Sequence, residues 1–239
     1  MKAPAEVQNL TERIAEEIRS QLVNGALTPG QRLSEAALSE SLEISRNTLR
    51  EVFRMLTKEG LLVHEPNKGV SVAVPSMASI IDIYRVRRMI ECQALAQAYP
   101  MHPALSLMRE AVETAKLLRG EENWSEVGTA NMAFHKAIVA LADSERLNEM
   151  FSHLLAELRL AFGLLRDPHF LHAPYVDMNQ KILQLFENGK PKEAAEELPM
   201  VPVPFDLSAL DEGPEADTDN GAQEAVTAAV AAAETASNV

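Results

Sequence analysis

The sequence predicts a mainly α-helical protein, in which an N-terminal winged helix-turn-helix is followed by an antiparallel all-α bundle. Residues 45–60 have the pattern of an amphipathic basic helix, with a short helical segment before it and two β-prone runs after it. Residues 76–198 show helical segments and no strand pattern, which indicates helices packed on helices. We therefore expect a winged domain at 1–75, a helical domain at 76–198 and a disordered tail at 199–239.

The first helix is expected from about residue 9 to residue 24, with Gly25 as its end. Its apolar side chains recur every four residues, which places them on one stripe. They are Leu10, Ile14, Ile18 and Leu22. The Thr-Pro-Gly run at 28–30 predicts a turn, and residues 32–33 predict a short strand of the wing sheet.

The helix at 45–60 has two faces of opposite character. Ser45 is expected to cap its N-terminus, and Gly60 to end it. A basic ridge of Arg46, Arg50, Arg54 and Lys58 lies opposite an apolar face of Leu49, Val52, Phe53 and Leu56. A solvated surface helix is the ordinary interpretation of such a pattern taken alone, so the neighbouring segments decide its function.

The segments on either side favour DNA recognition. Upstream, Ser34 can cap a short helix that a tight turn connects to the basic helix. Downstream, the β-prone runs 61–65 and 69–74 are joined by a Pro-Asn-Lys turn, which predicts a hairpin with Lys68 at its tip. This order is that of a winged helix-turn-helix, whose second helix enters the major groove of DNA.

Residues 27–74, LTPGQRLSEAALSESLEISRNTLREVFRMLTKEGLLVHEPNKGVSVAV, resemble the N-terminal domain of GntR-type transcription regulators. The resemblance assigns operator contacts to Arg46, Thr48, Arg50 and Gly69. A further DNA-contacting arginine of some members falls on Ala36 here, so that contact is expected to be missing.

The net charge of -13 is unevenly distributed, and its distribution is compatible with DNA binding. Residues 1–75 hold nine Lys/Arg and ten Asp/Glu, residues 76–198 hold thirteen and seventeen, and residues 199–239 hold none and eight. A nearly neutral domain with its cations on one helix can neutralise phosphates, with an affinity that depends on salt.

A single cysteine excludes an intramolecular disulfide, and no apolar run is long enough to span a membrane, so we expect a cytoplasmic protein.

The helical domain is expected to contain six segments, at about 79–98, 104–119, 123–142, 144–166, 174–188 and 191–198. Ser79 is the expected cap of the first, with Asp82 in its first turn and a linker at 75–78. Ala173-Pro174 is expected to break the chain between two helices.

Three stretches of this domain resemble the ligand-binding FCD-type bundle of the FadR branch of GntR regulators: DIYRVRRMIECQALAQA, NMAFHKAIVALADSERL and MNQKILQLFENGKPKEAAEEL. The resemblance implies a dimeric bundle with an effector cavity, which in many members surrounds a metal held by an aspartate and three histidines. Those four positions fall on Asn131, His135, Asn179 and about Val201, so His135 is the only candidate ligand retained.

Neutral amides are poor ligands for zinc, nickel or manganese, so we expect a metal-free cavity and no cofactor. Asn131, His135 and Asn179 are then expected to hydrogen-bond the effector. His153, His169 and His172 have no spacing that would let them replace the missing ligands, and isolated histidines in helical domains are usually structural.

Arg87 lies at helical spacing with Ile83, Ile90 and Ala94, so it projects from an apolar stripe. One interpretation is an ion pair with Glu91 at the edge of that stripe, although Arg before Glu is the weaker orientation. The other is a carboxylate-binding arginine, because a guanidinium suits a carboxylate through paired hydrogen bonds. We favour the second, and hence a small organic acid as effector.

Residues 199–239 depart from the family pattern. A Pro-rich run replaces the expected continuation of a long helix, and an acidic, Ala-rich stretch follows, with a transient helix near 223–235.

Taken together, the sequence predicts a ligand-responsive regulator that binds double-stranded operator DNA as a homodimer and is released by its effector. The alternative is a metal-dependent or other enzymatic bundle, but no Gly-rich phosphate loop and no hydrolase or zinc-protease motif is present.

Overall fold

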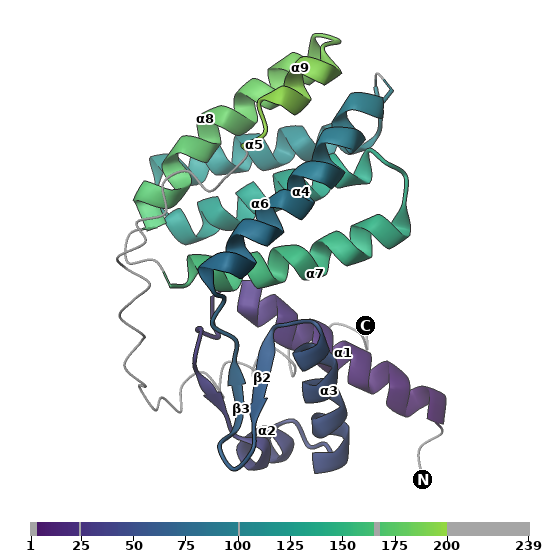
Figure 1. Ribbon diagram of the computed structural model, residues 1–239, viewed down its shortest axis with the longest axis vertical. Helices are drawn as coiled ribbons and strands as arrows, with labels where there is room; N and C mark the ends of the chain where they lie inside the picture. The colour runs from purple at the N-terminus through teal and green to yellow at the C-terminus, as the bar shows by residue number, and fades with distance from the viewer. Residues whose placement is uncertain (1–3, 24, 100, 165–167, 200–239) are drawn as a thin grey trace. The chain divides into compact units, whose positions relative to one another are not determined.

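The computed structural model describes residues 4–23, 25–99, 101–164 and 168–199 (Figure 1). The chain forms two compact units. The first holds the chain up to Val74 together with Arg159–Leu164, and the second holds Pro75–Leu158 and residues 168–199. The expected tail, with its short helix near 223–235, lies outside the described residues.

The first unit is a winged helix-turn-helix, as the sequence predicts. Its elements are α1 (Pro4–Val23), β1 (Arg32–Leu33), α2 (Glu35–Ser41), α3 (Arg46–Lys58), β2 (Leu62–Glu65) and β3 (Gly69–Val72). The sheet is antiparallel in the order β1-β3-β2, with Leu33 opposite Val70 and Val63 opposite Ser71. The short strand and the hairpin were both expected. Strand β1 pairs with β3 on the side opposite β2.

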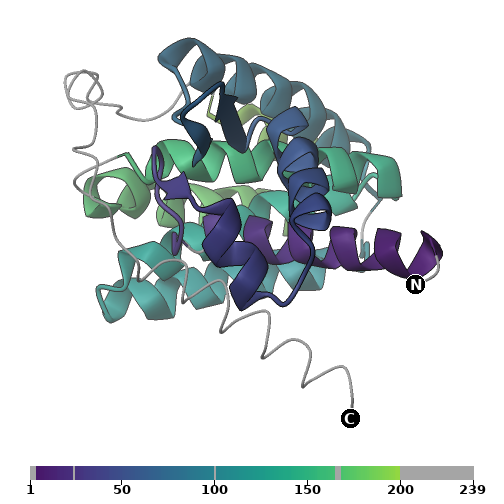
Figure 2. The ribbon, with the colours of Figure 1, turned by 90° about the horizontal axis from the view of Figure 1, so that it is seen from below.

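The core of this unit positions α3. The apolar face of α3 is buried against α1, α2 and β2 (Figures 1 and 2). Burying side chains of this size contributes about 1.5–3 kcal/mol each. A paired hydrogen bond adds to this, because Arg19 of α1 donates to both carboxylate oxygens of Glu59, the residue that caps α3, at 2.7 Å each. The face opposite the core is therefore held towards solvent.

The ends of α2 and α3 follow the expected caps. Ser34 Oγ accepts from the Ala37 amide at 3.3 Å, and Ser45 Oγ accepts from the Thr48 amide at 3.0 Å. Gly60, which follows the C-cap of α3, has a φ of 76°, a conformation that glycine adopts without strain. The expected start of α1 near residue 9 is wrong. The helix begins at Pro4, a residue type that is common at the first helical position.

The second unit is an all-α bundle. Its helices are α4 (Met77–Gln97), α5 (Ala104–Gly120), α6 (Trp124–Ala140), α7 (Glu145–Phe162), α8 (Pro168–Glu187) and α9 (Pro191–Glu196). The central helix is α6, which packs on α4, α5 and α8, while α9 packs on α4 and α8 (Figure 1). Phe134, Ile138, Leu95 and Ile182 lie at the core of these contacts, each fully buried.

Two expected helix boundaries in this unit are wrong. The first helix begins at Met77, because Ser76 rather than Ser79 is its cap: Ser76 Oγ accepts from the Ser79 amide at 3.2 Å. Pro174 does not separate two helices but lies inside α8. Its ring removes one backbone hydrogen bond. The two residues that follow it, Tyr175 and Val176, are buried. No helix among the described residues is long and apolar enough to cross a membrane.

Candidate DNA-recognition surface and buried polar cluster

The solvent-facing side of α3 carries the predicted basic ridge. All four of its cations are exposed, namely Arg46, Arg50, Arg54 and Lys58. Arg46 occupies the first helical position and makes no ion pair within the described part of the chain. The neighbouring Thr48 hydroxyl lies 2.8 Å from Ser45 Oγ, so it reinforces the cap while remaining at the surface. The N-terminal turn of α3 thus presents a free cation and a hydroxyl on one surface.

Arg50 is held by an ion pair that sequence reasoning missed. Its Nε donates to Glu35 Oε2 of α2 at 2.9 Å, and the arginine side chain is 51% exposed. Ion pairs at such exposure are worth about 0–1 kcal/mol, so a phosphate or a base edge can compete with Glu35. The two residues are fifteen positions apart on different helices, so no local spacing reveals the contact.

The wing brings the two other predicted contacts together at the β2–β3 turn. Asn67 and Gly69 both have positive φ, 65° and 88°, and Gly69 has open space where a Cβ would stand. The need for glycine here is therefore conformational rather than steric. Lys68 lies 2.9 Å from Glu65, and its ammonium lowers the pKa of that exposed carboxyl. Like Arg50, Lys68 is paired with a surface carboxylate that DNA could replace.

A buried polar cluster lies between α4 and α6 in the second unit. Arg87 Nε donates to Glu91 Oε1 at 2.9 Å, and Glu91 Oε2 lies 2.5 Å from His135 Nδ1. All three side chains are at most 5% exposed. The Arg87 guanidinium also lies 5.0 Å from the ring centroid of Tyr84, whose hydroxyl is 3.2 Å from that of Tyr175 on α8. The ion-pair interpretation of Arg87 is therefore the one the structure has, and its expected position at the edge of the stripe is wrong.

The protonation of this cluster follows from its contacts. Burial by itself raises the pKa of the Glu91 carboxyl, but the Arg87 guanidinium and the His135 ring hold that pKa below its ordinary value of 4.5. Burial lowers the pKa of His135 below its ordinary 6.5, although Glu91 acts in the opposite direction. An ionised Glu91 only accepts, so a neutral His135 carries its hydrogen on Nδ1. Its Nε2 then keeps a buried lone pair, which has no hydrogen-bond partner among the described residues.

The positions that the family resemblance assigns to a metal do not fit one here. Asn179 Nδ2 donates to Asn131 Oδ1 at 2.7 Å, so the two buried amides satisfy each other. His135 offers a single imidazole nitrogen, and the position near Val201 lies outside the described residues. Within the described ranges, no three His, Cys, Asp or Glu side chains form a group that could hold a metal ion. His153, His169 and His172 do not supply such a group.

The described space beside this cluster is small. The space beside Arg87 and Glu91 measures about 10 Å³ and is bounded by Leu198 and Pro199. Leu198 is held there because Arg88 donates to its carbonyl oxygen at 2.6 Å. The structure thus brings Arg87 and His135 together through Glu91, a residue that sequence reasoning treated only as a possible partner of Arg87. Leu198 and Pro199 close the described space beside Arg87 and Glu91.

Comparison with known proteins identifies both units. The model of the gntR family of bacterial regulatory proteins matches residues 10–72, and the FCD domain model matches residues 82–199. A crystal structure assigned as a GntR transcriptional regulator from Rhodococcus sp. RHA1 has 32% sequence identity and a TM-score of 0.75, and the match covers 92% of this chain and 98% of that one.

Named relatives agree with this assignment. The HTH-type transcriptional repressor RspR of Escherichia coli is 25% identical over 184 residues, which are 72% of this chain and 78% of the repressor. The HTH-type transcriptional regulator YdhC of Bacillus subtilis is 27% identical over 143 residues, or 58% of this chain. The chain spans less than two thirds of YdhC, 63% of its length. The chain belongs to the GntR family of bacterial regulatory proteins, with an FCD domain as its second unit.

Proposed function

We propose that this protein is a ligand-responsive transcription regulator, which represses genes by binding a pseudo-palindromic operator as a homodimer and is released by a small organic acid. The exposed basic face of α3, capped at Ser45 and flanked by the wing, is the observation that carries this proposal. Helices of this kind enter the major groove with their N-terminal residues against base edges. A regulator of transcription would work in the cytoplasm, where bacterial DNA lies.

In the bound state, two α3 helices would lie in successive major grooves, about 34 Å apart. Arg46 and Arg50 are the proposed base-reading residues, because they stand on the first two turns of α3. Thr48 and the wing residues Lys68 and Gly69 would contact the backbone. Arg54 and Lys58 lie further along the helix and would meet phosphates. Arg50 would exchange its carboxylate partner, Glu35, for the DNA.

The proposed effector step uses the buried cluster. A carboxylate that reached Arg87 would compete with Glu91 for the guanidinium and would accept paired hydrogen bonds. The Nε2 of His135, which has no partner among the described residues, would accept a hydrogen bond from a hydroxyl of the same ligand. Asn131 and Asn179 would separate and contribute further hydrogen bonds. Entry past Leu198 and Pro199 would move that segment and so would couple binding to a change in the bundle.

The enzymatic alternative finds no support among the relatives, whose names describe transcription regulators. The direct experiment is retardation of DNA from the protein's own promoter, with and without a panel of organic acids. We expect a sequence-specific shift that one class of acid reverses. A protein that shifts promoter and unrelated DNA equally at physiological salt would contradict the proposed function.

Calorimetry separates the effector step from DNA binding. The carboxylate that reverses the DNA shift should release heat on binding wild type and little or none on binding Arg87→Ala. Arg85→Ala is the matched control, since Arg85 is an exposed cation of α4 that makes no ion pair with Glu91. Equal heats for wild type and Arg87→Ala would remove Arg87 from the effector site.

A further inference from the structure

The acidic charge of this chain is concentrated in residues 200–239, which hold eight Asp/Glu and no Lys or Arg. Five of the eight fall within nine positions, namely Asp211, Glu212, Glu215, Asp217 and Asp219. We call residues 211–219 the acidic segment. Dense charge of one sign is typical of segments that bind a partner, and a cationic surface is what attracts this one.

Helix α3 carries the densest group of exposed cations among the described residues, four within its thirteen residues. Arg46, Arg54 and Lys58 make no ion pair with any described side chain, and Arg50 has only its half-exposed contact with Glu35. An exposed charge acts over about 8 Å at physiological ionic strength, so neighbouring cations on one helix act together. In the absence of DNA, this face therefore has positive charge that the described residues do not neutralise.

The second unit offers the acidic segment no comparable group of cations within its described residues. Several of its surface cations already have a carboxylate partner, as Arg109 has Glu187 and Arg119 has Asp177. The exposed cations without a carboxylate partner among the described residues stand singly on four helices, and they are Arg85, Lys136, Arg146 and Lys192. Such isolated charges cannot pair with several neighbouring acids at once.

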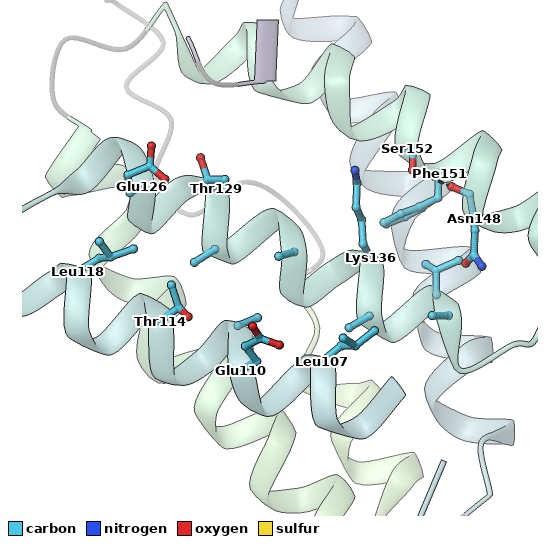
Figure 3. A pocket seen from close by; sticks show the side chains of 16 residues that line it. Leu107, Glu110, Thr114, Leu118, Glu126, Thr129, Lys136, Asn148, Phe151 and Ser152 are labelled. Atoms are coloured by element: carbon cyan, nitrogen blue, oxygen red, sulfur yellow. Dashed lines mark hydrogen bonds between the residues drawn. The ribbon is translucent and has the colours of Figure 1, made fainter. Parts of the chain in front are cut away.

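A groove of about 550 Å³ between α5, α6 and α7 is also unsuited to an acidic partner (Figure 3). Its charged lining residues are Glu110, Glu126 and Lys136, so acids outnumber the cation. The rest of its lining is mainly apolar, with alanines of α5 and α6, and burying carboxylates against such a surface is unfavourable. The basic face of α3 therefore complements the acidic segment better than the described surfaces of the second unit.

The spacing of the acids matches that of the α3 cations. Glu215, Asp217 and Asp219 stand at alternate positions. In an extended chain such residues point to one side about 6.6 Å apart, and residues four apart on an α-helix lie about 6 Å apart along its axis. An extended segment laid along α3 would thus bring one acid to each of three successive cations.

The intervening chain gives the acidic segment a long reach. Fifteen residues, 200–214, lie between the last described residue and Glu215, and fifteen residues span up to about 50 Å when extended. A compact unit of about 100 residues has a radius of gyration of about 13 Å, so the segment can pass around a whole unit. Tethering of this kind gives an effective concentration on the order of millimolar, at which several individually weak ion pairs suffice for contact.

We propose that the acidic segment docks on the basic face of α3 and competes with DNA for it. The inference rests on the proposed function, because it concerns regulation of the surface that is proposed to read the operator. The segment must leave α3 before any DNA binds, so it raises the apparent Kd for operator and for unrelated DNA by the same factor. Because the contact joins exposed charges, that factor falls towards one as salt rises.

The test is neutralisation of the acidic segment in the full chain, read by fluorescence anisotropy with operator and with unrelated duplex. Glu215→Gln/Asp217→Asn/Asp219→Asn should bind both DNAs about three- to tenfold more tightly at low salt, with a gain that shrinks as salt rises. The matched control, Glu110→Gln/Glu149→Gln/Glu196→Gln, removes three exposed charges from the bundle and should change affinity less than about twofold. No gain in the tail variant, or an equal gain in the control, would overturn the proposal.

A paramagnetic label locates the contact directly. Thr218→Cys in a Cys92→Ser background carries the label between two of the acids, and the amide signals of the full chain are recorded without DNA. The label should broaden the amides of Asn47 to Lys58, and operator DNA or high salt should reverse the broadening. Broadening on the bundle instead of α3, or none, would overturn the proposal. Because no DNA is needed, this result is independent of the operator specificity that tests the proposed function.

Discussion

Two arginine–glutamate pairs of this chain have the same chemistry and opposite surroundings. Arg50 and Glu35 meet at the surface of the winged domain, where the arginine is half exposed. Arg87 and Glu91 are almost fully buried in the helical domain, where His135 completes the cluster. A surface pair is weak and exchangeable, whereas a buried pair cannot lose one partner without leaving a charge uncompensated. The exposed Arg50–Glu35 pair suits an arginine that must exchange its carboxylate for DNA. The buried Arg87–Glu91 pair suits a cluster whose members must rearrange together.

The largest expected effect comes from breaking the buried pair. Glu91→Ala leaves the Arg87 guanidinium and the His135 ring without their shared acceptor, so unfolding free energy should fall by about 3–5 kcal/mol. Urea denaturation of the purified protein measures the change. Glu35→Ala, which breaks the exposed pair, is the matched comparison and should change stability by less than about 1 kcal/mol. Equal losses of unfolding free energy in Glu91→Ala and Glu35→Ala would contradict the difference in strength between the buried and the exposed pair.

A smaller effect is expected from pH. The pKa values of His135 and Glu91 are both lowered in the folded state, so the unfolded chain binds more protons and stability falls as pH falls. For His135 the loss begins as pH drops below its ordinary 6.5. His135→Gln should therefore lose less stability than wild type between pH 7.5 and 5.5, as urea titrations at each pH would show. His64→Gln, at an exposed histidine, controls for the loss of a histidine as such.

The smallest effect concerns the exposed pair. Glu35→Gln removes the carboxylate that competes with DNA for Arg50, so operator affinity should rise by a few fold with little change in stability. Fluorescence anisotropy with labelled operator measures this directly. Glu51→Gln is the control, because Glu51 is an exposed carboxylate of α3 with no ion pair among the described residues. An equal gain in both variants would reflect net charge rather than the Arg50 contact.

Local patterns predicted the winged domain well. The basic and apolar faces of α3, its Ser45 cap and the hairpin all depend on residues within one or two turns of each other, which periodicity reveals. The boundary errors at Ser76 and Pro174 have a different origin. Two serines three residues apart compete for the same cap, and tertiary burial overrides a proline inside a helix.

The candidate site was less predictable because its contacts join distant segments. Glu91 was considered for Arg87 from their four-residue spacing, but its contact with His135 spans 44 residues and depends on how α6 packs on α4. The Asn179–Asn131 bond spans 48 residues. Even the 10 Å³ space at this cluster depends on where the chain runs after α9, which no spacing indicates.

The most direct test of the central claim, that α3 reads operator DNA, is the affinity of Arg46→Ala and Arg50→Ala for the protein's own promoter at physiological salt. Loss of a base-reading arginine costs about 1–3 kcal/mol, so each variant should bind about five- to 150-fold more weakly. Arg13→Ala, an exposed arginine of α1, removes the same charge and should change affinity far less. Affinities of Arg46→Ala and Arg50→Ala within twofold of wild type would contradict the assignment of α3 to the major groove.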